Sequence, residues 1–140
     1  MMLHNNPLQK FQPFVLGLLR ITSAYMFLLH GTAKLFALPH IERFDNMPLF
    51  SMLGAAGVLE VAGGGLLLLG LFTRPVAFVL SGMMAVAYFM AHASQGAVLL
   101  PLMNGGEPAA LFCFIFLYLA AAGSGAWALD NLICAKRQTA

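Results

Sequence analysis

The sequence has few charged residues and lacks the motifs of the common soluble enzymes. Only 9% of its 140 residues are Asp, Glu, Lys or Arg, whereas 61% are hydrophobic. It contains no P-loop, no HExxH motif and no CxxC pair, which argues against nucleotide binding, zinc hydrolysis and thiol–disulfide exchange. The net charge of +2 is small, and no basic stripe with interleaved aromatic residues suggests nucleic-acid binding. The composition is typical of a membrane protein.

Cysteine is almost absent as well. Cys113 and Cys134 are the two cysteines of the chain. In one continuous helix they would lie ~30 Å apart, so we expect no bond between them. We interpret Cys113 as a packing residue.

Long hydrophobic runs are what the sequence does contain. They cover residues 14–36, 52–72, 76–93 and 109–127. Each run is close to the ~20 residues that a helix needs to cross a bilayer. The alternating polarity of a transmembrane barrel is absent, so helices are the expected form. We therefore predict an all-α integral membrane protein, an antiparallel bundle of four transmembrane helices over residues 14–131. Residues 1–13 and 132–140 are predicted to be tails.

The basic residues predict an orientation. Four of them fall on the side of the two termini, and two fall on the other side: Lys10, Arg74, Lys136 and Arg137 against Lys34 and Arg43. Because Lys and Arg are enriched in cytoplasmic loops, we predict cytoplasmic termini and a cytoplasmic turn at 73–75. Segments 37–51 and 94–108 would then face outward from the inner membrane.

Three charged residues interrupt the hydrophobic runs, namely Arg20, Lys34 and Glu60. Ionised groups at membrane depth are costly, and they usually face each other or a wet cavity. Arg20 and Lys34 share one helix face with small residues, and Glu60 is flanked by glycines. We therefore predict that these three side chains point inward and form an ion-pair network.

Further polar side chains are expected at the outer end of the bundle. At ~1.5 Å per residue, His30 lies within ~6 Å of the depth of Glu60. The predicted binding site consists of His30, Lys34, Glu60, His92, Asn104 and Glu107. Two interpretations stay open, a structural network that fixes helix register and a pocket for a small molecule. Haem between His30 and His92 is disfavoured because only one histidine pair is available, and no metal site is predicted.

Several short stretches, in this order and at this spacing, resemble the DoxX family of small four-helix membrane proteins. They are Leu18-Leu19-Arg20 through Phe27, His30-Gly31, Lys34, Glu60 to Gly64, Gly70, Thr73-Arg74, His92, Asn104 to Glu107, and Leu129-Asp130. The family takes its name from a subunit associated with a quinone-reducing thiosulfate oxidoreductase, and many members are called putative oxidoreductases.

The resemblance implies a redox setting and a quinone-like ligand. It leaves the catalytic residues unknown, and the chain has no recognisable flavin, haem or iron–sulfur motif. A membrane subunit of a quinone-linked oxidoreductase, whose redox centre belongs to a partner subunit, is one hypothesis. A non-enzymatic membrane protein, either a small-molecule carrier or an assembly scaffold, is the other. A homodimer would give a carrier more room than a single four-helix bundle.

Overall fold

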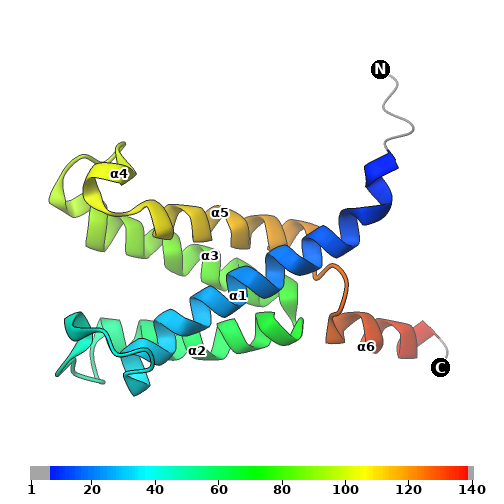
Figure 1. Ribbon diagram of the computed structural model, residues 1–140, viewed down its shortest axis with the longest axis horizontal. Helices are drawn as coiled ribbons and strands as arrows, with labels where there is room; N and C mark the ends of the chain where they lie inside the picture. The colour runs from blue at the N-terminus through cyan, green and yellow to red at the C-terminus, as the bar shows by residue number, and fades with distance from the viewer. Residues whose placement is uncertain (1–6, 139–140) are drawn as a thin grey trace.

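The computed structural model describes residues 7–138, and all regular structure within this range is helical (Figure 1). Four longer helices form the body of the molecule: α1 (Gln12–Phe36), α2 (Met52–Leu69), α3 (Thr73–Ala87) and α5 (Glu107–Ala122). A π-helical turn, η3 (Tyr88–His92), continues α3. The predicted all-α class is confirmed.

The longer helices pack as two pairs. α1 lies along α2, and α3 lies along α5, while contacts between the pairs are fewer. The chain reverses direction from each of these helices to the next, and the pairs converge near the turn that links α2 to α3 (Figure 1). We call this the turn end of the bundle, and the opposite end the open end.

Aromatic and aliphatic side chains join the two pairs. The ring of Phe27 on α1 lies 4.9 Å from that of Phe116 and 5.4 Å from that of Phe112, both on α5. Leu67 and Leu80 complete this core from α2 and α3, and both are almost fully buried. Such aromatic contacts add to the free energy gained by burial, so the pairs are held together at mid-height.

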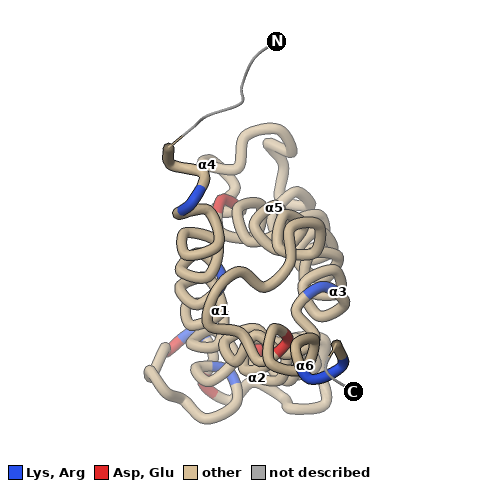
Figure 2. Tube along the Cα trace, turned by 90° about the vertical axis from the view of Figure 1, so that its right-hand side faces the viewer, with Lys and Arg blue, Asp and Glu red and all other residues tan. Residues whose placement is uncertain are grey.

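The outer surfaces of the helices are apolar. By length and hydropathy, three helical segments could cross a membrane: Pro7–Phe36, Met52–Leu69 and Thr73–Gln95. α5 is apolar but has only 16 residues. Large side chains such as Phe78, Phe89 and Phe114 are exposed on these helices. Figure 2 shows how sparse acidic and basic residues are along the chain. Contiguous apolar surface of this extent suits lipid rather than water.

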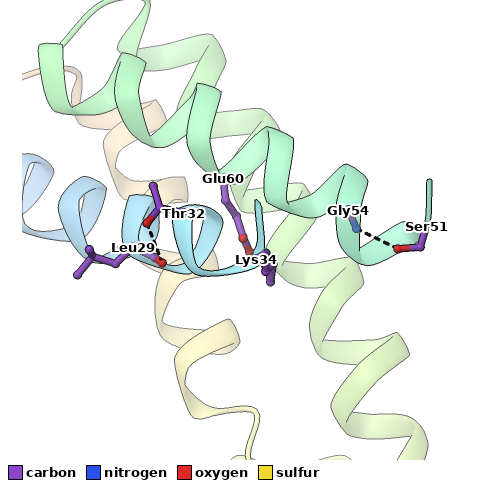
Figure 3. Close-up of polar contacts among 6 residues, drawn as sticks. All are labelled: Leu29, Thr32, Lys34, Ser51, Gly54 and Glu60. Atoms are coloured by element: carbon purple, nitrogen blue, oxygen red, sulfur yellow. Dashed lines mark hydrogen bonds and ion pairs between the residues drawn. The ribbon is translucent and has the colours of Figure 1, made fainter. Parts of the chain in front are cut away.

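The ends of α2 and α3 follow from local hydrogen bonds. The hydroxyl of Ser51 accepts a hydrogen bond from the amide of Gly54 at 3.2 Å and caps α2 (Figure 3). Gly70 ends α2 with a positive φ of 67°. The carboxylate of Asp130 accepts hydrogen bonds from the amides of Phe72 and Thr73. Because these amides begin α3, the turn lies at 70–72 rather than at the predicted 73–75.

The terminal and loop segments also differ from expectation. The last hydrophobic run leaves the helical path at Gly123, which has a φ of 98°, so α5 stops before residue 127. A further helix, α6 (Leu129–Gln138), covers much of the segment 132–140 that we predicted to be a tail. The predicted tail 1–13 contains η1 (Pro7–Phe11), and residues 1–6 and 139–140 lie outside the described residues. Short turns lie in the loops: η2 (Glu42–Phe44), η4 (Ala93–Gln95) and α4 (Pro101–Asn104).

Candidate functional site

A cleft of about 580 Å³ lies between the two helix pairs at the open end. α1, α2, α3 and α5 all contribute to its walls, and the loop before α2 adds Arg43 and Phe44. Four of the six predicted site residues line it: His30, Lys34, Glu60 and His92. Its volume is that of a typical small-molecule site.

An ion pair lies at the border of the cleft. The ammonium of Lys34 on α1 lies 2.5 Å from Oε1 of Glu60 on α2 (Figure 3). The two side chains are only 10% and 5% exposed. The other carboxylate oxygen, Oε2 of Glu60, is buried and has no hydrogen-bond partner among residues 7–138. The pair therefore links α1 to α2 and leaves one strong acceptor unused.

The two histidines reach the cleft from different helices. The ring of His30 on α1 stands edge-on to Phe112 at 6.1 Å. His92 ends the π-helical turn, and its Nδ1 lies 3.1 Å from the backbone oxygen of Asn104. A π-helical turn changes the direction in which the following side chains point, and such turns often occur at functional sites. This turn positions His92 on the cleft wall.

Asn104 and Glu107 do not line the cleft. The side chain of Asn104 holds its own loop together: it donates to the hydroxyl of Tyr88 at 3.3 Å and accepts from the amide of Gly106 at 2.8 Å. Asn104 thus supports the site indirectly, through its backbone contact with His92. Glu107 is exposed in the first turn of α5, where a carboxylate is favoured by the helix dipole.

The remaining lining is apolar and rich in methionine. Met52 lines it from α2, and Met83, Met84 and Met90 line it from the α3 side. Met52, at the start of α2, and Met90, in η3, are also exposed, so this lining is accessible at the open end. Methionine side chains are flexible and polarizable and adapt to ligands of different shape. The sequence analysis missed this lining, although four methionines on two neighbouring runs were a readable signal.

Phe44 is a second residue that the sequence analysis missed. Its ring lies 5.7 Å from the ammonium of Lys34 and covers the charge from the loop side. A cation facing an aromatic ring is stabilised electrostatically, more so where water is scarce. No periodic pattern in the loop marks this residue.

Arg20 lies apart from the Lys34–Glu60 pair, so the expected three-residue network is a pair in the structure. Arg20 is fully buried near the turn end. Its five N–H groups match five backbone carbonyls at 2.7–3.0 Å: those of Leu67, Leu68, Ser124, Ala126 and Trp127. The carbonyls of a helix's last turn have no partner within the helix and carry its negative dipole end. Leu67 and Leu68 lie in the last turn of α2, whereas Ser124, Ala126 and Trp127 lie in the segment after α5, so this one guanidinium group joins the end of α2 to that segment.

Arg74 does the same for the other pair. From the first turn of α3 it donates to the carbonyls of Ala120, Ala121 and Ala122 at the end of α5, at 2.6–3.4 Å. Each helix pair is therefore fastened at the turn end by an arginine of its first helix and the final carbonyls of its second. Both arginines therefore have a structural role at the turn end.

A larger hollow of about 780 Å³ also lies at the turn end, against α6. Its charged lining includes Arg74, Asp130 and Arg137. Arg74 and Asp130 are already engaged with the ends of α5 and α3. The cleft at the open end is the better candidate, because it combines an apolar wall with the buried Lys34–Glu60 pair at its border.

Metal binding finds no support in residues 7–138, which contain no group of three or more His, Cys, Asp or Glu able to hold a metal ion. Both cysteines are free thiols. Cys113 is half-buried, and its backbone oxygen accepts a hydrogen bond from Ser81 at 2.8 Å. Cys134 is exposed on α6.

Comparison with known proteins now identifies the family. The family model of DoxX matches residues 15–93, which is more than half of the chain. The chain belongs to the DoxX family. The resemblance noted from the sequence is thereby confirmed, and the matched span holds the four predicted site residues that line the cleft: His30, Lys34, Glu60 and His92.

A relative in Haemophilus influenzae, described as an uncharacterized protein, is 50% identical over 128 residues, which cover 90% of this chain and 96% of the relative. No solved structure matches the chain. The motif stretches Asn104 to Glu107 and Leu129-Asp130 lie beyond the span that the DoxX model matches.

Proposed function

We propose that this DoxX protein binds a quinone-like small molecule in the cleft at the open end, as the membrane subunit of a quinone-linked oxidoreductase system. The proposal rests on one observation: an apolar, methionine-rich wall and four polar side chains line the same cleft. The four are His30, Lys34, Glu60 and His92. A quinone needs an apolar slot for its ring and tail and polar partners for its two oxygens. α2 and α3 diverge from their shared turn toward the open end (Figure 1), and in this proposal the ligand enters from the lipid between them.

In this proposal α5 is the fourth membrane span, so the bundle is a four-helix antiparallel one. At ~24 Å it is shorter than the ~30 Å hydrocarbon core, and bilayer thinning or helix tilt in the other spans would accommodate it. The termini face the cytoplasm and the open end faces outward from the inner membrane, in line with the excess of Lys and Arg on the terminal side.

In this scheme the redox centre belongs to a partner subunit. A partner subunit that carries one would exchange electrons with the bound ring, while His30, Glu60 and His92 offer places for its protons. A second copy of the chain beside the bundle would shield the part of a bound tail that extends beyond the cleft.

A purely structural function is the competing proposal, and one observation favours it. Arg20 and Arg74 fasten helix ends without any ligand, so charged residues in this bundle can serve architecture alone. An assembly scaffold or a small-molecule carrier would then be the better description, with the Lys34–Glu60 pair fixing the register of α1 against α2.

Titration calorimetry of the purified protein with a short-chain benzoquinone separates these proposals. We expect saturable binding to the wild type, and loss of binding in the His30→Ala/Glu60→Gln double variant. Glu107→Gln is the matched control, since Glu107 is a carboxylate that lies outside the cleft. Absence of saturable binding, or binding unchanged by the double variant, would leave the scaffold proposal ahead. Trp127 packs against Phe14 and not in the cleft, so its fluorescence should report unfolding rather than binding.

A further inference from the structure

The charged side chains that line the cleft, among the residues that the structure describes, are two cations and one carboxylate. Lys34 and Arg43 supply the positive charges, and Glu60 supplies the negative one. The other carboxylates near the open end do not line the cleft: Glu42, Asp45 and Glu107. When the histidines are neutral, the lining therefore has an excess of one positive charge.

Both cations keep N–H donors that have no acceptor within residues 7–138. An ammonium has three N–H groups, and Lys34 gives one of them to Oε1 of Glu60 (Figure 3). Arg43 is exposed, and no hydrogen bond or ion pair joins its guanidinium to the described part of the chain. The unused hydrogen-bonding capacity of the two cations is thus available to a ligand that brings acceptors.

The loop before α2 places the two cations on the same side of the cleft. In η2, Arg43 is followed directly by Phe44, and the ring of Phe44 lies 5.7 Å from the ammonium of Lys34. Both loop residues line the cleft. The long side chain of Arg43 therefore lies beside the part of the cleft that Lys34 borders.

The wall formed by α3, η3 and α5 is different in character. It presents Met83, Met84 and Met90 from α3 and η3, and Phe112 from α5. In the described lining, these three elements contribute no Asp, Glu, Lys or Arg. Methionine sulfur makes favourable contacts with aromatic rings, so this wall suits a ring better than an aliphatic chain. The cleft thus has a cationic side and an apolar side.

From this arrangement we infer that the cleft selects an anionic ligand: a lipophilic ring that carries an ionised oxygen, which accepts hydrogen bonds from Lys34 and Arg43. The inference rests on the proposed function and adds the charge of the quinone-like ligand. An ionised oxygen makes stronger hydrogen bonds to cationic donors than a neutral carbonyl oxygen does. It also balances the excess positive charge where an apolar wall limits screening by water. A neutral quinone would leave that charge unbalanced.

Calorimetry with two naphthoquinones tests this on the purified full-length protein in a non-ionic detergent at neutral pH. The first carries a hydroxyl that is conjugated with a ring carbonyl, so it is ionised under these conditions. The second is the methyl ether of the first, which keeps the ring and all of the oxygens but is neutral. One charge-assisted hydrogen bond corresponds to a factor of about ten or more in affinity. We expect the anion to bind at least about tenfold more tightly than the ether.

Substitutions at Arg43 assign the preference to the named charge. Arg43→Gln keeps a hydrogen-bonding side chain but removes the excess positive charge, so it should abolish most of the preference for the anion. Arg43→Lys keeps the charge and should retain much of the preference. Lys10→Gln is the matched control, because Lys10 lies in η1, outside the cleft. It should leave the preference unchanged.

Decanoate, an aliphatic anion, separates a ring ligand from a fatty acid. Because methionine and aromatic side chains form the apolar wall, we expect decanoate to bind more weakly than the naphthoquinone anion. Equal or tighter binding of decanoate would overturn the inference in favour of a fatty-acid ligand.

The remaining outcomes separate this inference from the proposed function. If the ether binds as tightly as the anion, the inference is overturned while the quinone site stands. A preference for the anion that survives Arg43→Gln unchanged also overturns it. If neither naphthoquinone binds the wild type, the proposed function fails and this inference fails with it.

Discussion

Gly31 on α1 lies directly against Glu60 on α2. A Cβ atom at position 31 would lie 2.8 Å from the Cβ of Glu60, and also 2.8 Å from the backbone nitrogen of Val61. Only a glycine lets the two helices approach so closely at this level. The Lys34–Glu60 pair sits one turn farther along α1, so the close approach at Gly31 is what brings the ammonium and the carboxylate into contact.

Gly31→Ala should destabilise the protein by about 1–3 kcal/mol, the usual range for overpacking in a close-packed interior. The added methyl group meets the backbone of α2, which cannot move aside as a flexible side chain would. Thermal unfolding in detergent, followed by circular dichroism, measures the effect.

Gly65→Ala is the matched control, since nothing lies within 4 Å of a Cβ atom at that helical position. The control should be neutral or slightly stabilising because alanine favours helix more than glycine does. Equal effects of the two substitutions would contradict the tight contact between α1 and α2.

Arg20→Lys should destabilise the protein strongly. An ammonium group has three N–H donors, whereas Arg20 serves five carbonyls. At least two of these buried or partly buried carbonyls would then lose their side-chain donor, at up to about 1–3 kcal/mol each. The expected loss is about 2–6 kcal/mol of unfolding free energy.

Arg74→Lys is the comparison for Arg20→Lys. Arg74 serves three carbonyls and is exposed, so lysine can replace it at a cost below about 1 kcal/mol. We expect Arg20→Lys to have the lower midpoint of thermal unfolding. If Arg74→Lys has the lower midpoint instead, the five hydrogen bonds of Arg20 are not the main stabilising contact at the turn end.

The membrane orientation can be tested with thiol labelling in intact cells. Cys134 on α6 is exposed, and the proposed orientation places it in the cytoplasm. A membrane-impermeant maleimide should leave it unlabelled until the cells are permeabilised. Met103 is 74% exposed in the loop at the open end, and Met103→Cys in a Cys113→Ala/Cys134→Ala background should react at once. The reverse pattern of labelling would invert the bundle.

The sequence predicts the helices well because their causes are local. Apolar runs of membrane length define α1 and α2, and Ser51 and Gly70 mark the ends of α2 by their own conformational preferences. The turn before α3 was placed too late, because the carboxylate that fixes it belongs to Asp130, 57 positions away from Thr73. The end of α5 was likewise placed too late, since aliphatic composition continues past Gly123 into a segment that is not helical.

The site was predicted only in part, for a different physical reason. The rise of a helix gives the depth of a residue but not its rotational position within the bundle. Four predicted residues are close in depth and also face the cleft: His30, Lys34, Glu60 and His92. Arg20 was predicted to pair with a carboxylate because opposite charges can be matched from residue types alone. Its hydrogen-bond partners are backbone carbonyls, and because every residue has one, the sequence does not indicate which of them Arg20 contacts. The division into two helix pairs, which creates the cleft, depends on packing that no single segment encodes.

Paired substitutions can separate the structural and the binding parts of the Lys34–Glu60 pair. Glu60→Leu or Lys34→Met alone leaves a buried charge without its partner, and we expect each to lower the unfolding free energy by about 3–5 kcal/mol. Together, Lys34→Met/Glu60→Leu replaces both charges with apolar groups of similar length, which is often neutral or stabilising. Most of the stability should therefore return, as measured by thermal unfolding. Quinone binding should not return, because the double variant keeps the packing but has lost both charged groups at the border of the cleft. A double variant that is stable and still binds the ring with wild-type affinity would show that the pair serves only the contact between α1 and α2.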